Sequence, residues 1–219
     1  MRLAIFDLDH TLLTADSDFL WGQFLCQQGV VDADAYARQN LRFYQDYQSG
    51  TLDMAAFCAF SFKPLTEHPR AWLEAWRAAF VADKIEPVIA PGAVPLINQH
   101  KAAGDFTLIM TATNRFITAP IAERLGVDAL IATDPEEVDG QFTGRLSGVA
   151  NFQHGKVIRL AQWREDHPQT FDHVTFYSDS RNDLPLLEAA DVAVAIDPDP
   201  VLKLEAEQRG WPIRSLRGH

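Results

Sequence analysis

Short apolar runs recur along the chain, and each is bounded by polar or turn-forming residues. Runs of this length, rich in Val, Ile, Leu and Phe, favour buried β-strands over helices. They cover residues 3–8, 106–110, 129–132, 174–177 and 192–196. Strands that are apolar on both faces are typical of a parallel sheet that helices cover on each side.

From residue 92 onward, segments with helical apolar spacing alternate with these runs. The predicted helices cover residues 93–103, 117–125, 156–167, 184–190 and 200–209. Alternating strands and helices predict βαβ units, so the expected fold class is α/β, with a Rossmann-like parallel sheet covered by helices on both faces. Between residues 138 and 144, the sequence VDGQFTG predicts a hairpin because Asp-Gly is a common turn pair.

Residues 16–86 show a different pattern, with four stretches of helix-like apolar spacing. Gly29 and Gly50 separate the first three stretches, and KPLTEHP separates the fourth. The sequence therefore predicts a four-helix-bundle cap, residues 16–86, inserted after the first strand of an α/β core formed by residues 1–15 and 87–219. Five aromatic residues of this segment are interpreted as the core of the cap: Trp21, Phe24, Phe43, Trp72 and Trp76.

Composition and charge narrow the possible partners of this chain. The net charge of −11 argues against general binding to nucleic acid or to anionic membranes. Cys26 and Cys58 form no CxxC motif and are interpreted as reduced thiols. No apolar stretch approaches the roughly 20 residues that span a bilayer, and no basic leader precedes the first apolar run. We therefore expect a cytoplasmic protein, and its oligomeric state stays open.

Polar residues of chemical interest stand at the ends of three predicted strands and at the start of one helix. The set consists of Asp7 and Asp9, Thr111 and Thr113, Lys156, and Asp179 and Asp183. Taken singly, each has an ordinary explanation, since an Asp can cap a turn or helix and a Lys is usually a surface cation. In a parallel sheet, however, the carboxyl ends of the strands meet at one edge, where ligands bind. Because separate segments bring matching chemistry to that edge, we interpret the set as one site.

The chemistry that requires such a set is phosphoryl transfer to a carboxylate nucleophile. Carboxylates about 4 Å apart repel each other by about 4 kcal/mol at an effective dielectric constant of 20. A cation between them relieves this repulsion, and oxygen-only ligands in an open site favour Mg²⁺. The ammonium of Lys156 and the hydroxyl of Thr111 are then suited to hold phosphate oxygens.

The motifs also resemble a known family. DLDHT at residues 7–11, a strand-ending Thr111, Lys156 before a helix and SDSRND at residues 178–183 match, in order and spacing, the four motifs of the haloacid dehalogenase-like hydrolases. The helical insertion resembles the cap of the phosphoserine-phosphatase-like subgroup. The resemblance covers essentially the whole chain and implies an Mg²⁺-dependent phosphomonoester hydrolase.

This resemblance assigns roles to matching positions. Asp7 resembles the nucleophile that forms a phospho-aspartate, and Asp9 resembles the general acid and base. Family dehalogenases lack the second Asp, so Asp9 favours phosphate ester hydrolysis. The implied phosphate-binding residues are Thr111, Lys156 and Asn182. The implied Mg²⁺ site contains Asp7, Asp9 through its backbone carbonyl, Asp179 and a supporting Asp183.

The predicted cap bears on the substrate. Asp16 stands nine residues after Asp7, where phosphoserine phosphatases place a Glu that meets the substrate ammonium, although Asp16 can also be a helix cap. Their carboxylate-binding Arg corresponds to Ala59, unless Arg42 or Lys63 takes over its role. These residues favour a small amine-bearing metabolite phosphate without a carboxylate, with histidinol phosphate as the best guess and phosphoserine as the alternative.

A receiver domain and a phosphotransferase are the alternatives to a hydrolase, and His10 is a further polar residue of the first motif. A receiver domain that holds a phosphoryl group as a switch is an alternative of another class, but receivers lack the paired Asp7 and Asp9 and have no helical insert. Transfer of the phosphoryl group to an alcohol in place of water also stays open. His10 is interpreted as a loop residue that points away from the phosphate.

Overall fold

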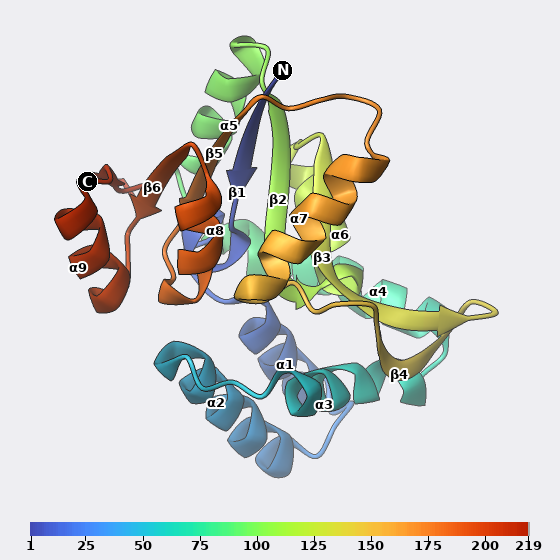
Figure 1. The fold of residues 1–219 in the computed structure, drawn as a ribbon. Coiled ribbons are helices and arrows are strands. Elements are labelled where there is room, and N and C mark those ends of the chain that lie inside the picture. Colours follow the sequence, from blue (N-terminus) through green and yellow to red (C-terminus); the bar gives the residue numbers. More distant parts are fainter. Residues whose placement is uncertain (219) are drawn as a thin grey trace.

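The protein is described here by a computed structural model of residues 1–218. A seven-stranded sheet of order β4-β3-β2-β1-β5-β6-β7 forms its centre (Figure 1). The strands are β1 (Arg2–Phe6), β2 (Phe106–Asn114), β3 (Ala129–Val138), β4 (Gln141–Ser147), β5 (His173–Ser178), β6 (Val192–Ile196) and β7 (Ile213–Arg214). Neighbouring strands are parallel, except that β3 and β4 are antiparallel. The predicted α/β fold class is therefore confirmed.

Helices cover both faces of this sheet because alternate residues of each buried strand point to opposite sides. Leu3 and Ile5 of β1 pack in one apolar cluster with α7 (His154–Asp166), α8 (Leu184–Ala189) and α9 (Pro200–Arg209). Ala4 and Phe6 pack on the other side in a cluster with α5 (Ala93–Ala102) and α6 (Arg115–Leu125). Figure 1 shows α7 and α8 in front of the sheet and α5 behind it.

The ends of several strands differ from the predicted ones, and the largest differences are in β1, β2 and β3. Strand β2 continues past residue 110 to Asn114. β1 ends at Phe6 because residues Leu8–Leu12 form an irregular turn, in which His10 has a φ of 57°. β3 extends to Val138 because its second half pairs with β4, outside the parallel part of the sheet. Asp139 and Gly140 form the turn between them, both with positive φ, so the predicted Asp-Gly hairpin is confirmed.

Four helices follow β1 before α5 leads the chain back to β2: α1 (Ser17–Gln27), α2 (Ala33–Ser49), α3 (Met54–Glu67) and α4 (Arg70–Phe80). Asp16, Asp32 and Asp53 cap the first three by accepting hydrogen bonds from backbone N–H groups of the first turn. Figure 1 shows α1, α2 and α3 beyond the carboxyl end of β1. They therefore face the edge of the sheet at which the polar motifs were expected.

Helix α4 makes polar contacts with the sheet side of the molecule. Arg77 donates a hydrogen bond to the carbonyl oxygen of Phe116 in α6 (3.0 Å), and Arg70 pairs with Glu137 of β3 (3.0 Å). The outer face of α4 is open, and Trp72 is 59% exposed. The interpretation of Trp72 as cap core is therefore wrong, because helical spacing does not show which face of a helix is covered.

Of the other four aromatic residues interpreted as cap core, Trp21, Phe24 and Phe43 are buried and Trp76 is half-buried. Trp21 and Phe24 of α1 contact Phe80 of α4 edge-on, with ring centroids 5.2 and 5.7 Å apart, and Trp21 also meets Phe116 of α6. Phe43 packs between α2 and α3. The aromatic residues of α1 thus join the inserted helices to the α/β part of the chain.

Two smaller expectations can be compared with the structure. Within residues 1–218, no helix is both long and apolar enough to cross a membrane. Cys26 and Cys58 are free thiols, as predicted.

Candidate active site

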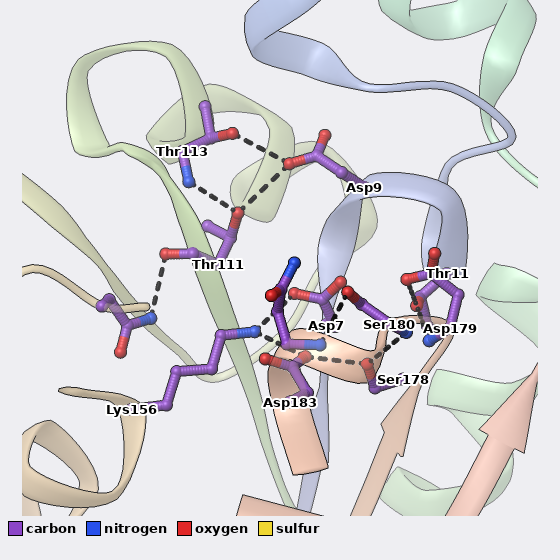
Figure 2. A network of polar contacts seen from close by, with 12 residues as sticks. Asp7, Asp9, Thr11, Thr111, Thr113, Lys156, Ser178, Asp179, Ser180 and Asp183 are labelled. Atoms are coloured by element: carbon purple, nitrogen blue, oxygen red, sulfur yellow. Dashed lines mark hydrogen bonds and ion pairs between the residues drawn. The ribbon is translucent and has the colours of Figure 1, made fainter. Parts of the chain in front are cut away.

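A buried lysine joins two of the predicted carboxylates. Asp7 follows β1 directly, and its Oδ1 lies 2.8 Å from the Nζ of Lys156, which lies 2.7 Å from Oδ2 of Asp183 (Figure 2). Lys156 is only 2% exposed, so the alternative of a surface cation is wrong. Burial lowers the pKa of Lys156, but Asp183 and Asp7 raise that pKa more strongly, so it lies above its usual value. Lys156 is therefore a fixed cation.

Local geometry explains how Lys156 reaches this position. It lies in the first turn of α7, just after Gly155. A Cβ atom at Gly155 would lie 2.1 Å from the carbonyl oxygen of Ala150, so only glycine allows this approach. Gly155 thus lets the first turn of α7 lie directly against the loop that precedes it, and Lys156 follows in that turn.

The pairing of β1 with β5 brings the first and last motifs together. Phe6 lies opposite Tyr177, and the N–H of Asp7 donates to the carbonyl oxygen of Tyr177 at 2.9 Å. Beyond this pair, the hydroxyl of Thr11 donates to Oδ1 of Asp179 at 3.0 Å and accepts from the N–H of Asp179 at the same distance. The hydroxyl of Ser178 donates to Oδ2 of Asp183 at 2.7 Å, on the same oxygen that Lys156 contacts.

The Asp9 carboxylate turns toward β2 and α1. Its Oδ2 accepts hydrogen bonds from the hydroxyls of Thr113 (2.9 Å) and Thr111 (3.3 Å), as Figure 2 shows. Its Oδ1 accepts from the N–H of Ser17 at 2.6 Å, at the start of α1. Thr113 is therefore a direct partner of Asp9. The structure brings Asp7, Asp9, Thr111, Lys156, Asp179 and Asp183 to one edge of the sheet, as expected.

Asn151 is a part of the site that the sequence analysis missed. Its side-chain amide donates to the carbonyl oxygens of Thr111 (2.9 Å) and Ile131 (3.0 Å), and its N–H donates to the hydroxyl of Thr133. It is fully buried between β2, β3 and the start of α7. A single Asn in a turn gives no signal in the sequence, because its partners are backbone atoms of distant strands.

The carboxylates of the site repel one another in the way the sequence predicted. Burial raises the pKa of Asp7 to about 7; Lys156 lowers it, and Asp183 and Asp9 raise it further. Burial, Asp7 and Asp183 raise the pKa of Asp179 well above its usual value, against a lowering by the Thr11 hydroxyl. A cation beside Asp7 and Asp179 would relieve both effects.

The oxygen donors of Asp7 and Asp179 fit a divalent cation such as Mg²⁺. The carboxylate of Asp9 binds Thr113, Thr111 and the N–H of Ser17, and that of Asp183 binds Lys156 and Ser178. The expected roles of the Asp9 backbone carbonyl and of Asp183 as a support for the cation therefore stay predictions. No group of three or more His, Cys, Asp or Glu side chains within residues 1–218 is arranged to hold a metal ion. This leaves two carboxylates, together with backbone carbonyls, as the donors of a cation site.

Polar contacts also tie the inserted helices to this edge. The side-chain amide of Asn182 donates to the carbonyl oxygen of Tyr47 in α2 (3.0 Å), and its Oδ1 accepts from Gln153 (3.1 Å). His10 lies with its Nε2 3.2 Å from the hydroxyl of Tyr44. Asn182 therefore links α2 to the start of α7, and its expected role toward phosphate stays a prediction, as does the direction of His10 relative to phosphate.

A pocket opens between this edge and the inserted helices. Four carboxylates line it, from Asp7, Asp9, Asp16 and Asp18, and aromatic side chains of α1, α2 and α3 form much of the remaining wall: Phe19, Phe43, Tyr44, Tyr47 and Phe57. Among residues 1–218, neither Lys nor Arg lines this pocket. The pocket is therefore acidic and aromatic, which suits a cationic or N–H-rich group.

Asp16 caps α1 and also lines the pocket, and its expected role toward a substrate ammonium stays a prediction. Its Oδ1 accepts a hydrogen bond from the N–H of Phe19 at 2.7 Å and so caps α1. The same side chain lines the pocket, and burial, Asp9 and Asp18 together raise its pKa well above the usual value. Capping therefore does not remove Asp16 from the candidate site.

The comparison of Ala59 with a carboxylate-binding Arg is wrong. Ala59 is exposed on α3, whereas Met54 and Phe57 line the pocket. Arg42 and Lys63 are also exposed, and Lys63 pairs with Glu67 on the surface at 3.4 Å. Neither lines the pocket, so neither replaces the missing Arg. The residues of α3 that line the pocket therefore lie on a different face of the helix from Ala59.

Comparison with known proteins agrees with this geometry. A family model described as haloacid dehalogenase-like hydrolase matches residues 4–188. The chain is 42% identical over 220 residues to a histidinol-phosphatase of Neisseria meningitidis, covering 99% of both chains. It is 32% identical over 217 residues to a phosphoserine phosphatase of Mycobacterium tuberculosis, covering 98% of this chain and 70% of that protein. A solved structure of a protein with unknown function from Bordetella pertussis is 43% identical, with a TM-score of 0.92 over 98% of both chains.

Proposed function

Since the chain belongs to the haloacid dehalogenase-like hydrolase family and is a phosphatase of that type, we propose that it hydrolyses a small amine-bearing phosphate ester by way of an aspartyl-phosphate, with Mg²⁺ as its cofactor. Histidinol phosphate is the substrate that we propose. Membership of a hydrolase family speaks against the alternative of a receiver-like switch.

Asp7 and Asp9 carry the proposed chemistry. Oδ2 of Asp7 attacks phosphorus while the bond from phosphorus to the ester oxygen breaks, and Asp9 gives its proton to that leaving oxygen. Asp9 then takes a proton from a water molecule, which attacks phosphorus and releases inorganic phosphate and the free Asp7 carboxylate. The geometry supports this assignment because Lys156 contacts Oδ1 of Asp7 and leaves Oδ2 for the attack.

Positive charge and hydroxyl groups would hold the transferred phosphoryl group. Lys156 and Thr111 are the proposed phosphate-binding residues, with Asn182 beside them. Asp7 and Asp179, the backbone carbonyl of Asp9 and a supporting Asp183 would hold Mg²⁺. Bound there, the cation would neutralise charge on the phosphoryl oxygens.

The acidic and aromatic lining of the pocket carries the choice of substrate. Asp16 is the proposed partner of the substrate ammonium, and the aromatic walls suit an imidazole ring. Phosphoserine, the second candidate, carries a carboxylate that would face four Asp side chains without a Lys or Arg from the pocket wall. Similarity over the whole chain to a histidinol-phosphatase supports the first choice.

We further propose that residues 16–86 form the cap that selects the substrate, over a catalytic core of residues 1–15 and 87–219. Location in the cytoplasm is part of the same proposal, as the place of a small-metabolite phosphatase. Asn182 donates a hydrogen bond to Tyr47 in α2, and Gln153 donates one to Gly50 at the end of α2. These contacts support a cap that closes the pocket against the core.

The proposal can be tested by phosphate release from histidinol phosphate and from phosphoserine, each measured with the purified chain and Mg²⁺. We expect a higher kcat/KM for histidinol phosphate. A preference for phosphoserine would overturn the choice of substrate, and release from neither would overturn the choice of substrate class. Adding an alcohol acceptor and analysing the products would show whether water is the final acceptor.

A further inference from the structure

A second carboxylate of the cap lines the pocket without a cationic partner. Asp18 of α1 is 8% exposed, and its Oδ1 accepts a hydrogen bond from the hydroxyl of Ser61 in α3 at 3.0 Å. Within residues 1–218, Oδ2 of Asp18 has no hydrogen-bond donor, and neither oxygen forms an ion pair. A buried carboxylate costs free energy unless something compensates its charge. Its free oxygen is therefore suited to a ligand group.

Asn40 offers a second acceptor in the same wall. It is 4% exposed in α2, and its side-chain nitrogen donates to the carbonyl oxygen of Phe19 at 3.1 Å. In the described part of the chain, no donor faces the Oδ1 of Asn40, although the residue lines the pocket. Asp18 and Asn40 thus both line this pocket, and each keeps a side-chain oxygen without a donor among residues 1–218.

Helix α1 has a glycine, Gly22, at the point where the side chain of Asn40 packs against it. A Cβ atom at Gly22 would lie 2.5 Å from the side-chain nitrogen of Asn40 and 2.9 Å from its Cγ. Glycine inside a helix costs about 1 kcal/mol relative to alanine. A glycine at this point allows the Asn40 amide to lie directly against α1, which holds the acceptor in place.

From these contacts we infer that Asp18, with Asn40, is a specificity-determining site that accepts hydrogen bonds from the imidazole ring of the substrate. The inference rests on the proposed function, in which Asp16 receives the ammonium group. A substrate with two nitrogen-bearing groups then meets two separate carboxylates. Phe43 and Phe57, whose ring centroids are 5.5 Å apart, supply an aromatic wall in the same pocket.

The electrostatics of Asp18 support this assignment. Burial raises the pKa of Asp18 to about 7, against a lowering by Ser61 and with a further rise from Asp9. An imidazolium beside the carboxylate would favour its charged form, because an opposite charge lowers the pKa of an acid. Imidazole titrates near neutral pH, so it can supply that charge.

The test compares two substrates in matched variants, with Mg²⁺ present. Histidinol phosphate carries a ring and an ammonium, whereas O-phosphoethanolamine carries only the ammonium. For Asp18→Asn, we expect the ratio of kcat/KM values for the two substrates to fall roughly tenfold to a hundredfold, the range for loss of a charged hydrogen bond. Asp16→Asn should lower both values together. Asp34→Asn, an exposed Asp of α2, should keep the ratio within about twofold.

Two further measurements separate recognition from folding and from turnover. The midpoint of thermal unfolding of Asp18→Asn should equal or exceed that of the wild type, since a neutral amide is easier to bury than an unpaired carboxylate. A lower midpoint would indicate a structural role and count against the inference. In an Asp7→Asn background, calorimetry should show that adding Asp18→Asn weakens binding of histidinol phosphate by a factor similar to the loss in the ratio.

The outcomes distinguish this inference from the proposed function. An unchanged ratio in Asp18→Asn, with histidinol phosphate still the preferred substrate, would overturn the role of Asp18 alone. A wild type without preference for histidinol phosphate over phosphoserine would overturn the proposed function, and the inference with it.

Discussion

The two ends of the pocket differ in how their carboxylates are compensated. At the sheet edge, Lys156 joins Asp7 and Asp183, and hydroxyl groups or backbone N–H groups bind Asp9 and Asp179. At the cap end, the Asp18 carboxylate accepts one hydrogen bond from residues 1–218, that of the Ser61 hydroxyl. The first set resembles a preorganised reaction centre, in which charges are held before the substrate arrives.

Under the proposed function, this difference separates the groups that carry the chemistry from those that select the substrate. Groups that act on every phosphate ester need fixed positions, which the strands and Lys156 provide. Groups that discriminate among esters need polar atoms without a partner in the protein, because a substrate that supplies the missing hydrogen bond is then favoured over one that does not. The predictions below act on one end or the other, from the largest expected effect to the smallest.

Removal of the nucleophile should have the largest effect. Asp7→Asn keeps the volume of the side chain but removes the attacking oxygen, so kcat should fall by about 10⁴-fold or more, the scale seen when nucleophiles are deleted. Steady-state phosphate release measures this, and circular dichroism checks that the fold persists. Turnover at the wild-type rate would contradict the mechanism.

Removal of divalent cations should abolish hydrolysis by acting on the groups at the sheet edge and not on those of the cap. After treatment with EDTA and dialysis, we expect phosphate release to fall to background, because the charges of Asp7 and Asp179 and of the phosphoryl group lose their common counter-ion. Addition of Mg²⁺ should restore the rate. Full activity in the continued presence of EDTA would refute a role for the cation.

Replacement of Lys156 should affect both activity and stability. Lys156→Ala leaves Asp7 and Asp183 buried without their cation, so the free energy of unfolding should fall by about 3–5 kcal/mol. The value of kcat/KM should fall by about 10²–10³-fold, as for loss of one fixed electrostatic donor. Urea titration and phosphate release measure the two effects. As a control, Lys203→Ala on the exposed surface of α9 should change stability by at most about 0.5 kcal/mol.

Removal of the surface cations of the cap should have the smallest effect. Arg42→Ala and Lys63→Ala should each keep kcat/KM within about twofold for histidinol phosphate and for phosphoserine, since neither side chain lines the pocket. A selective loss of phosphoserine hydrolysis in either variant would show that the cap moves to bring a cation to the substrate carboxylate.

The sequence was informative about the sheet edge because the patterns that encode it are local. A short apolar run followed by Asp7, or by Asp179, identifies both a strand and its carboxyl end. Parallel strands then converge on one edge whatever the details of packing. For this reason order and spacing predict that Asp7, Lys156 and Asp183 belong to one site, whereas the ion pairs of Lys156 with the two carboxylates are visible only in the structure.

The cap was less predictable because helical spacing gives the period of a helix but not its rotation. Ala59 was counted onto the pocket side and lies outside, while Met54 and Phe57 line the pocket. Trp72 was expected in the core of the cap but lies on the exposed face of α4. These errors have one cause, since the partner helix decides which row of side chains is covered.

By itself, the sequence determined the α/β architecture, the inserted helices and the edge at which the polar motifs meet. Only the tertiary structure decided the partners of those groups. Asp9 is turned toward Thr113, and Asn182 is bound to α2. Among residues 1–218, Asp18 keeps one oxygen without a donor in the pocket that Asn40 also lines. The physical reason is the separation along the chain of the residues that encode each feature. Periodicity and strand ends are written within a few residues, whereas hydrogen-bond partners come from segments far apart in the chain.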